Sequence, residues 1–223
     1  MKLSGSTALV TGANRGIGRS FAEGLLERGA GKVYATARRP ELIDLPGVEV
    51  LRLDITDPDS VAAVAAKAGD VDLLINNAGI STGQDLVGGD LGEIKREMDT
   101  HFYGTLAMVR AFAPILGANG GGGILNVLSV LAWRSFPGAG AYAAAKAAEW
   151  NLTNGVRLEL ADQGTLVSAL VLAATDTDMM AGFDVPKNAP ADVVQKALDG
   201  LETDQLEILA DDWSIQAKAE LAS

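Results

Sequence analysis

Cysteine is absent from this 223-residue chain, and histidine occurs only once. The absence of cysteine excludes disulfide bonds, thiolate metal sites and a cysteine nucleophile. A single histidine excludes a multi-histidine metal centre, so the sequence predicts no metal site. Aromatic residues make up only 5% of the chain, whereas glycine is abundant at 26 residues. So much glycine predicts many turns and close backbone approaches.

Positive charge is also scarce. Lysine and arginine total 18 residues against 29 aspartates and glutamates, which gives a formal net charge of −11. This balance argues against a nucleic-acid-binding protein, because such proteins usually have a basic surface. Any anionic ligand must then be held by local features. The sequence contains no apolar run of about 18 residues and no signal peptide. We therefore expect no membrane partner and a cytoplasmic location.

Apolar, β-prone segments alternate with segments of helical periodicity along the chain. The expected strands are 7–10, 32–37, 48–55, 71–79, 123–130, 165–173 and 205–210. The expected helices are 18–30, 57–69, 91–116, 139–161 and 190–201, with a short amphipathic helix in the tail, 211–223. This alternation predicts an α/β fold, a parallel sheet covered on both faces by helices. No repeat or linker interrupts it, so we expect residues 1–223 to form a single domain.

Three glycines, Gly12, Gly16 and Gly18, lie between the first expected strand and the first expected helix. Glycine allows a tight turn and a close backbone approach to a pyrophosphate, and the helix N-terminus directs N–H groups at it. Glycine loops also form ordinary turns. The strand–loop–helix setting at the start of an alternating chain favours a dinucleotide phosphate site.

The end of the second expected strand distinguishes two cofactors. An acidic residue there would bind the ribose 2′-hydroxyl of NAD, but this chain has "TARR" at residues 36–39. Arg38 can hold a 2′-phosphate by charge-assisted hydrogen bonds, and Arg15 in the glycine loop can add a second positive group. The alternative interpretation is that both arginines are solvated surface residues. The sequence favours NADP(H), with NAD(H) the second choice.

Tyr142 and Lys146 are four residues apart in an alanine-rich segment expected to be helical. Residues at this spacing share one helix face. An ammonium group favours the phenolate and lowers the pKa of a phenol from its usual value of about 10. Such a phenol can exchange a proton with a carbonyl or alcohol oxygen. Ser129 ends the preceding strand, where ligands of parallel sheets bind. A half-buried tyrosine and a surface lysine are the alternative.

Together these motifs resemble the short-chain dehydrogenase/reductase family. The glycine loop "TGANRGIG", "LDITD" at 53–57, "NNAG" at 76–79, Ser129 and the Tyr142–Lys146 pair follow the family's order and separation. The resemblance covers residues 7 to about 180. Each motif alone is weak evidence for the family, but five motifs in the family's order are specific evidence for it.

The resemblance implies a Rossmann-type doubly wound seven-stranded parallel sheet and hydride transfer between a nicotinamide and a carbonyl or alcohol. It makes Tyr142 the acid/base, Lys146 the residue that holds the nicotinamide ribose, and Ser129 the residue that orients the carbonyl oxygen. It also implies a homodimer or homotetramer built on the helices at 91–116 and 139–161. The cofactor-binding residues it implies are Gly12, Asn14, Arg15, Gly16, Ile17, Gly18, Arg38, Asp54, Ile55, Asn77, Ala78, Gly79, Tyr142, Lys146, Thr175 and Thr177.

Two places depart from the family pattern. His101 stands where the family usually has an asparagine that holds a water of the proton relay. A neutral imidazole donates and accepts one hydrogen bond each, so His101 is a candidate catalytic residue, with a structural histidine as the alternative. Leu172 and Ala173 replace the usual Pro-Gly. A side chain at Ala173 disfavours positive φ and is expected to narrow the nicotinamide pocket.

The segment 179–189 is the expected substrate lid. Its apolar residues, and those that follow Ser129, predict an apolar pocket; the alternatives are core or a subunit interface. These residues are Met179, Met180, Phe183, Leu131, Trp133 and Phe136. The sequence therefore predicts an NADPH-dependent reductase of small to medium apolar aldehydes or ketones. An NADPH-binding sensor or regulatory protein without turnover is the alternative.

Overall fold

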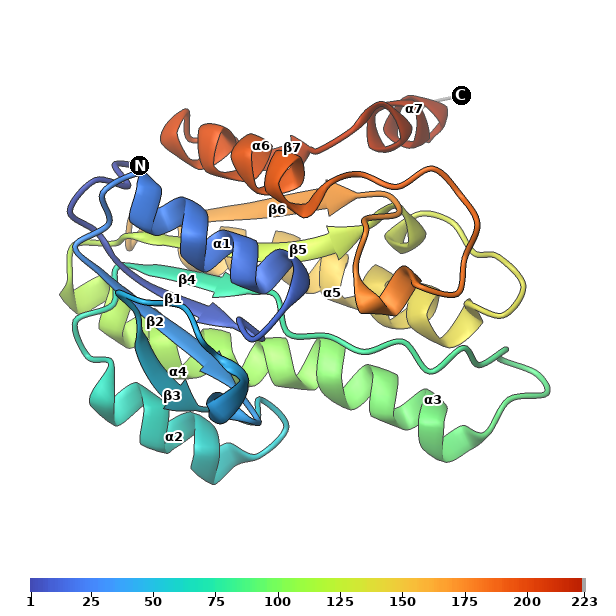
Figure 1. Ribbon diagram of the computed structural model, residues 1–223, viewed down its shortest axis with the longest axis horizontal. Helices are drawn as coiled ribbons and strands as arrows, with labels where there is room; N and C mark the ends of the chain where they lie inside the picture. The colour runs from blue at the N-terminus through green and yellow to red at the C-terminus, as the bar shows by residue number, and fades with distance from the viewer. Residues whose placement is uncertain (222–223) are drawn as a thin grey trace.

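The computed structural model describes residues 1–221. Its centre is one parallel sheet of seven strands in the order β3-β2-β1-β4-β5-β6-β7 (Figure 1). The strands are β1 (Thr7–Thr11), β2 (Lys32–Ala37), β3 (Glu49–Arg52), β4 (Leu73–Asn76), β5 (Gly123–Ser129), β6 (Leu166–Leu172) and β7 (Glu207–Leu209). The predicted α/β fold with a seven-stranded parallel sheet is confirmed.

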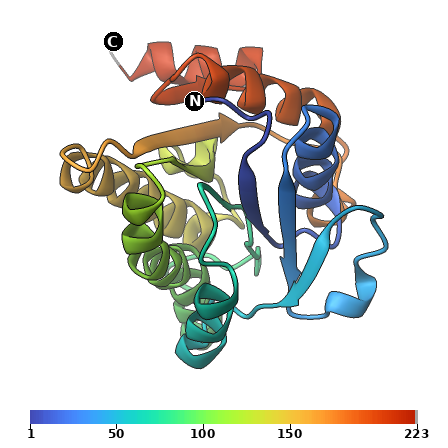
Figure 2. The same cartoon turned by 90° about the vertical axis from the view of Figure 1, so that its left-hand side faces the viewer.

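Helices cover both faces of the sheet, because its central strands are apolar on both sides (Figure 2). On one face α1 (Gly16–Glu27) packs with α6 (Pro190–Glu202). On the other face lie α2 (Pro58–Lys67), α4 (Thr105–Ala118) and α5 (Gly140–Glu159). Between β2 and β3 the chain forms only a 3₁₀ turn, η1 (Pro40–Leu42). The short 38–47 segment therefore holds no crossover helix.

The helix expected at 91–116 is interrupted. It consists of α3 (Leu91–Met98), a π-helical segment η2 (Asp99–Gly104) and α4, which ends at Ala118. A π-helical turn inserts an extra residue into the helical repeat and occurs often at functional sites. This π-helical segment contains His101, the residue at which the sequence departs from the family pattern. The prediction of one continuous helix over 91–116 is therefore wrong.

The tail helix α7 (Asp212–Glu220) is present but is not amphipathic as predicted. It buries the small residues Ser214 and Ala217, whereas Trp213 and Ile215 are more than half exposed. Asp211 caps it by accepting a hydrogen bond from the backbone N–H of Ser214 at 2.7 Å. Residues 222–223 of the expected tail lie outside the described residues.

The sheet reverses its strand order at β1, which lies between β2 and β4. Ligands of such sheets bind at the carboxyl ends of the strands beside this point. The glycine loop follows β1 there, and the segment that begins at Asn77 follows β4. None of the helices described between residues 1 and 221 is long and apolar enough to cross a membrane.

Candidate active site

The glycine loop requires its three glycines for geometric reasons. Gly12 has φ +67° and Gly16 φ +53°, in the left-handed region that favours glycine. A Cβ atom on Gly18 would lie 2.2 Å from the carbonyl oxygen of Gly12. Asn14 and Ile17 are half-buried in the same loop. The loop conformation therefore depends on the absence of side chains.

Helix α1 begins in this loop with its first N–H groups available. Arg15 at the N-cap has extended backbone, and no described side chain caps the helix there. Such an N-terminus binds a phosphate group through its N–H groups and its dipole. Asn77 supports the loop: its side-chain amide donates to the Thr11 carbonyl at 2.9 Å. The loop thus fits the pyrophosphate of a nicotinamide dinucleotide.

The end of β2 lies beside the glycine loop, because the Ala13 N–H donates to the Thr36 carbonyl oxygen at 2.9 Å. Arg38 follows two residues later and is exposed. Arg15 is also exposed and forms an ion pair with Asp178 at 2.5 Å. The two predicted 2′-phosphate ligands therefore lie on segments that meet at the loop, and one of them has a carboxylate partner.

The segment after β3 forms a turn of its own. Asp54 Oδ1 accepts from the Thr56 N–H at 3.0 Å and from the Thr56 hydroxyl at 2.7 Å. Ile55 is buried, and a Cβ atom on Gly104 would lie 2.8 Å from its Cδ1 atom. This turn holds Asp54 and Ile55 at the same sheet edge as the glycine loop, where the predicted adenine contacts require them.

Ser129, Tyr142 and Lys146 come together at the carboxyl end of β5. Ser129 is the last residue of that strand, and the other two lie in the first turns of α5. The Lys146 Nζ atom is 5.8 Å from the centre of the Tyr142 ring. The Ser129 hydroxyl lies close enough to be one of the smaller influences on the pKa of Tyr142, which it lowers. The structure therefore gathers the predicted catalytic triad in one place.

Lys146 has a partner that the sequence reasoning missed. Its buried ammonium group donates to Glu149 Oε2 and to the Val127 carbonyl oxygen, each at 2.7 Å. Burial disfavours the ammonium form, but the Glu149 carboxylate outweighs burial and raises the pKa of Lys146. The signal in the sequence is a lone acidic residue among the alanines, one helical turn after the lysine.

His101 lies against Tyr142. The two rings are 5.1 Å apart at an interplanar angle of 89°, and the histidine is 1% exposed. Its Nε2 atom lies 2.8 Å from the Ile80 carbonyl oxygen and 3.5 Å from a carboxylate oxygen of Glu97. A Cβ atom on Gly79 would lie 2.7 Å from the imidazole, so the glycine of "NNAG" makes room for the histidine.

The pKa of Tyr142 corrects one prediction. Burial is the largest influence and raises the pKa above its usual value of 10.0. Lys146 lowers it as predicted, but the carboxylates of Glu149 and Glu97 raise it again. Tyr142 is therefore a neutral phenol at neutral pH in this structure, not a phenol tuned down toward the working pH.

The segment after β6 lies next to the glycine loop. A Cβ atom on Gly16 would lie 3.1 Å from the Thr177 methyl group. Thr175 is buried and pairs with Asn188 in a parallel bridge. Ala173 does not adopt positive φ, since Asp204 is the one non-glycine among residues 1–221 that does. The alanine at the family's glycine place is accommodated by ordinary backbone.

The expected apolar pocket divides into two groups. Leu131 and Trp133 pack with Trp150 against the core under α7, and the Lys218 ammonium lies 5.0 Å above the Trp133 ring. For these residues the alternative, core packing, is correct. The remaining large side chains stay near the surface, with Phe183 59% exposed and Phe136 44% exposed.

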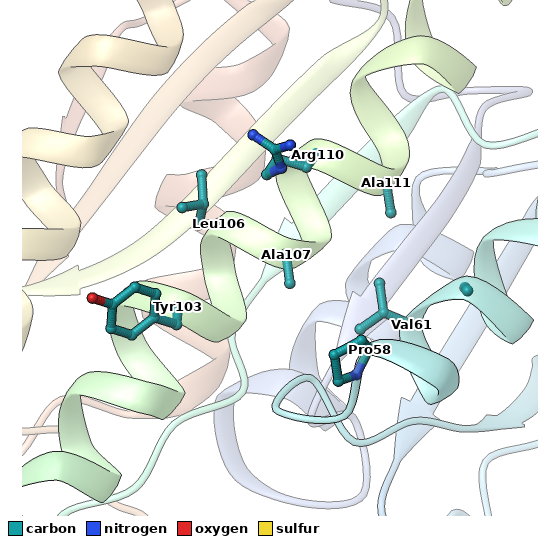
Figure 3. Close-up of a pocket in the computed structure, with 8 residues that line it drawn as sticks. Pro58, Val61, Tyr103, Leu106, Ala107, Arg110 and Ala111 are labelled. Atoms are coloured by element: carbon teal, nitrogen blue, oxygen red, sulfur yellow. The ribbon is translucent and has the colours of Figure 1, made fainter.

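A groove of about 380 Å³ lies elsewhere, between α2 and α4 (Figure 3). Pro58 and Val61 face Ala107 and Ala111 across it, and Tyr103 lines one end of the groove. The groove is lined by none of the predicted catalytic residues. It is therefore separate from the site at β5.

Comparisons with known proteins agree with this geometry. The family model of the short chain dehydrogenases matches residues 6–187. A sorbitol dehydrogenase of Cereibacter sphaeroides is 35% identical over 199 residues, which are 82% of this chain and 76% of that protein. A 3-oxoacyl-(acyl-carrier-protein) reductase of Vibrio cholerae is 35% identical over 189 residues, which are 80% of this chain and 77% of that protein.

Solved structures give the same result. A short chain dehydrogenase from Burkholderia cenocepacia in complex with NADP superposes with a TM-score of 0.96 at 39% identity, covering 100% of this chain and 95% of the other. A short-chain dehydrogenase from Sphingobium yanoikuyae in complex with NADPH gives a TM-score of 0.84 at 29% identity, covering 97% and 94%.

Proposed function

The chain belongs to the short-chain dehydrogenase/reductase family, and from that premise we propose that it is an NADPH-dependent carbonyl reductase with Tyr142 as its acid/base. The family's enzymes are oxidoreductases that act on alcohol or carbonyl groups. The observation that carries the proposal is the gathering of Ser129, Tyr142 and Lys146 at the end of β5, one strand away from the "NNAG" end of β4.

A bound nicotinamide supplies the hydride that reduces the carbonyl carbon. Ser129 donates a hydrogen bond to the carbonyl oxygen and orients it beside Tyr142. The Tyr142 phenol then donates its proton to that oxygen as negative charge develops. A neutral phenol is the required form, and burial keeps Tyr142 in that form. The Lys146 ammonium stabilises the phenolate that remains.

We propose NADP(H) as the preferred cofactor. Two of the similar solved structures hold NADP or NADPH, and Arg38 follows β2 where a 2′-phosphate would lie. The phosphate groups would be held by the N–H groups of α1, and the ribose of the nicotinamide by Tyr142 and Lys146. Competition from Asp178 for Arg15 makes Arg38 the main 2′-phosphate ligand.

The substrate class we propose is small to medium apolar aldehydes and ketones. The support is the apolar, partly exposed lid around Met179 and Phe183, together with Phe136 from the segment after β5. The segment from Asp178 to Asn188 is tied to the body of the protein at its two ends, by the Arg15 ion pair and the Thr175 bridge. Its middle is therefore the part that can close over a substrate.

The alternative is a protein that senses NADPH without turnover. The test is NADPH absorbance at neutral pH against a panel of aldehydes and ketones. Consumption of NADPH that requires both protein and carbonyl supports the enzyme. Binding of NADPH without consumption across the panel, aliphatic and aromatic ketones included, contradicts it and supports the sensor.

A homodimer or homotetramer is proposed on the faces of α4 and α5. Leu158 on α5 is 79% exposed, and Tyr103 before α4 is 58% exposed beside the groove of Figure 3. Exposed apolar side chains of this kind mark association surfaces. Light scattering coupled to gel filtration should give the mass of a dimer or tetramer, and a monomer mass would contradict the assembly.

A further inference from the structure

Four buried charged side chains lie behind Tyr142, and the proposed mechanism uses only one of them. Glu97 is 0% exposed, His101 1%, Glu149 2% and Lys146 5%. They come from three elements: α3, the π-helical segment η2, and α5. We refer to Glu97, His101, Lys146 and Glu149 as the buried tetrad. Isolated buried charges are strongly unfavourable, so the tetrad requires a physical explanation.

Two carboxylates and one carbonyl oxygen face the imidazole ring of His101, together with one backbone N–H and the Lys146 ammonium group. The Nε2 atom lies 2.8 Å from the Ile80 carbonyl oxygen and 3.5 Å from Glu97 Oε2. The Ile80 N–H also donates to Nε2, in a longer hydrogen bond of 3.4 Å. The Nδ1 atom lies 3.7 Å from Glu149 Oε2. Burial and the Lys146 ammonium group disfavour the imidazolium form, but the contacts with Glu149 and Glu97 outweigh them and raise the pKa of His101. The oxygens around the ring therefore favour the imidazolium, in which both nitrogens carry protons.

The charges of the tetrad then cancel. Two carboxylates, one ammonium group and one imidazolium group have no net charge. Among the described residues, His101 Nδ1 and Glu97 Oε2 are buried without a hydrogen bond. The ionic contacts are therefore what compensates their burial. A neutral His101 would leave the buried tetrad with one uncompensated negative charge.

Glu97 is also held by contacts outside the tetrad. Its Oε1 atom accepts from the Thr82 N–H at 2.6 Å and from the Thr82 hydroxyl at 2.9 Å. Burial opposes the ionised form, but the His101 contact and these hydrogen bonds outweigh it and lower the pKa of Glu97. One carboxylate of the tetrad is thus held in place by the segment after β4.

Glu149 connects the two cations. Its Oε2 atom accepts from Lys146 at 2.7 Å and faces His101 Nδ1, while its Oε1 atom accepts from the Thr105 hydroxyl at 3.0 Å. Burial opposes its ionised form too, but Lys146 and His101 outweigh burial and lower the pKa of Glu149. A change at Glu149 must therefore affect both His101 and the lysine beside Tyr142.

We propose that Glu149 and Glu97 are positioning residues that hold His101 as an imidazolium and Lys146 beneath Tyr142, so that a charge-balanced tetrad sets the ionisation of the catalytic tyrosine. His101 in this arrangement is a buried cation and not a neutral substitute for an asparagine. The inference rests on the proposed role of Tyr142, but its consequences are measurable without turnover.

The single histidine makes the first test unambiguous. Nuclear magnetic resonance of wild-type protein with ¹⁵N-labelled histidine reports on His101 alone, since the chain has one histidine. Both ring nitrogens should be protonated at neutral pH, with a titration midpoint above the usual value of about 6.5. A neutral ring at pH 7, or a midpoint at or below that value, would overturn the proposal. This measurement requires no variant, so a folding defect cannot obscure it.

Variants then identify the residues responsible. Glu149→Gln and Glu97→Gln should each lower the histidine midpoint, because each removes a negative charge from the ring's surroundings. Glu159→Gln, an exposed residue of the same helix as Glu149, is the matched control and should leave the midpoint unchanged. Equal histidine midpoints in the wild type and both tetrad variants would contradict the proposed role of Glu149 and Glu97.

The link to Tyr142 has its own readout. The chain has only three tyrosines, so ultraviolet absorbance of phenolate, after subtraction of the matching Tyr142→Phe protein, follows Tyr142. In Glu149→Gln, Tyr142 should ionise at a lower pH than in the wild type, because Glu149 raises its pKa. Unchanged ionisation would overturn the link. If both titrations agree but no carbonyl is reduced, the proposed function fails and the tetrad stands.

Discussion

The two halves of the site use charged and polar groups in different ways. The cofactor half, around the glycine loop, has backbone N–H groups and two exposed arginines, Arg15 and Arg38. The catalytic half, around α5, has a lysine, a histidine and two glutamates that are each at most 5% exposed. One half relies on glycine geometry and solvated cations, the other on mutual neutralisation of buried groups. The halves should therefore fail differently when they are changed.

The largest effect is expected at the glycine loop. Gly18→Ala places a Cβ atom 2.2 Å from the Gly12 carbonyl oxygen, and backbone cannot yield as a flexible side chain can. We expect loss of NADPH binding and a decrease in unfolding free energy above the usual overpacking cost of about 1–3 kcal/mol. NADPH fluorescence titration and urea unfolding measure the two effects.

Gly69→Ala is the matched control, because its Cβ atom would meet nothing within 4 Å. It should bind NADPH as the wild type does. Wild-type binding by Gly18→Ala as well would contradict the account of the loop.

The contribution of the catalytic half to the free energy of unfolding should depend on pH. The lowered pKa values of Glu97 and Glu149 contribute stability above their unfolded values of about 4.3, which is lost as the pH falls through the folded values. The raised pKa of His101 contributes stability below about 6.5, which is lost as the pH rises through the folded value. The tetrad should therefore contribute most to the free energy of unfolding of the protein between about pH 4.5 and 6.5.

Urea unfolding of the wild type and His101→Asn at pH 6 and pH 9 tests this. The wild type should lose more unfolding free energy between these pH values than the variant, since only the wild type has a histidine that holds its proton more tightly in the folded state than in the unfolded state. Parallel losses in both proteins would contradict the assignment.

A smaller effect is expected at Arg38. Arg38→Ala removes charge-assisted hydrogen bonds to the 2′-phosphate, worth about 1.5–3 kcal/mol, or roughly 10- to 150-fold in affinity. The dissociation constant for NADPH should rise by that factor, and the constant for NADH should change little. Equal losses of affinity for the two cofactors would contradict the assignment of NADP(H). Arg39→Ala, at the neighbouring exposed position, is the control.

Patterns local to the chain predicted most of the fold and half of the site. Alternating apolar strands and helices indicated the sheet. Ser129 ends a strand and Tyr142 and Lys146 share a helix, as expected, because strand ends and helix faces follow from spacing. The π-helical segment was not predicted, since one inserted residue leaves a long helical pattern almost unchanged. The α7 helix was expected to be amphipathic, but it packs through the small residues Ser214 and Ala217.

The tetrad lay beyond the reach of sequence reasoning for a different reason. A glutamate in a helix is usually solvent-exposed, so Glu97 and Glu149 had no reason to attract attention. Their importance arises only when α3, η2 and α5 pack together and enclose them with His101. Local patterns do not encode such a compensation between elements.

Tyr142→Phe tests the central claim most directly. The variant retains the ring and loses only the hydroxyl that donates the proton. NADPH oxidation with the best carbonyl of the panel should fall by at least about 10²-fold, while fluorescence titration should show that the variant still binds NADPH, because the glycine loop, Arg38 and Lys146 are unchanged. Wild-type turnover by Tyr142→Phe would contradict the account.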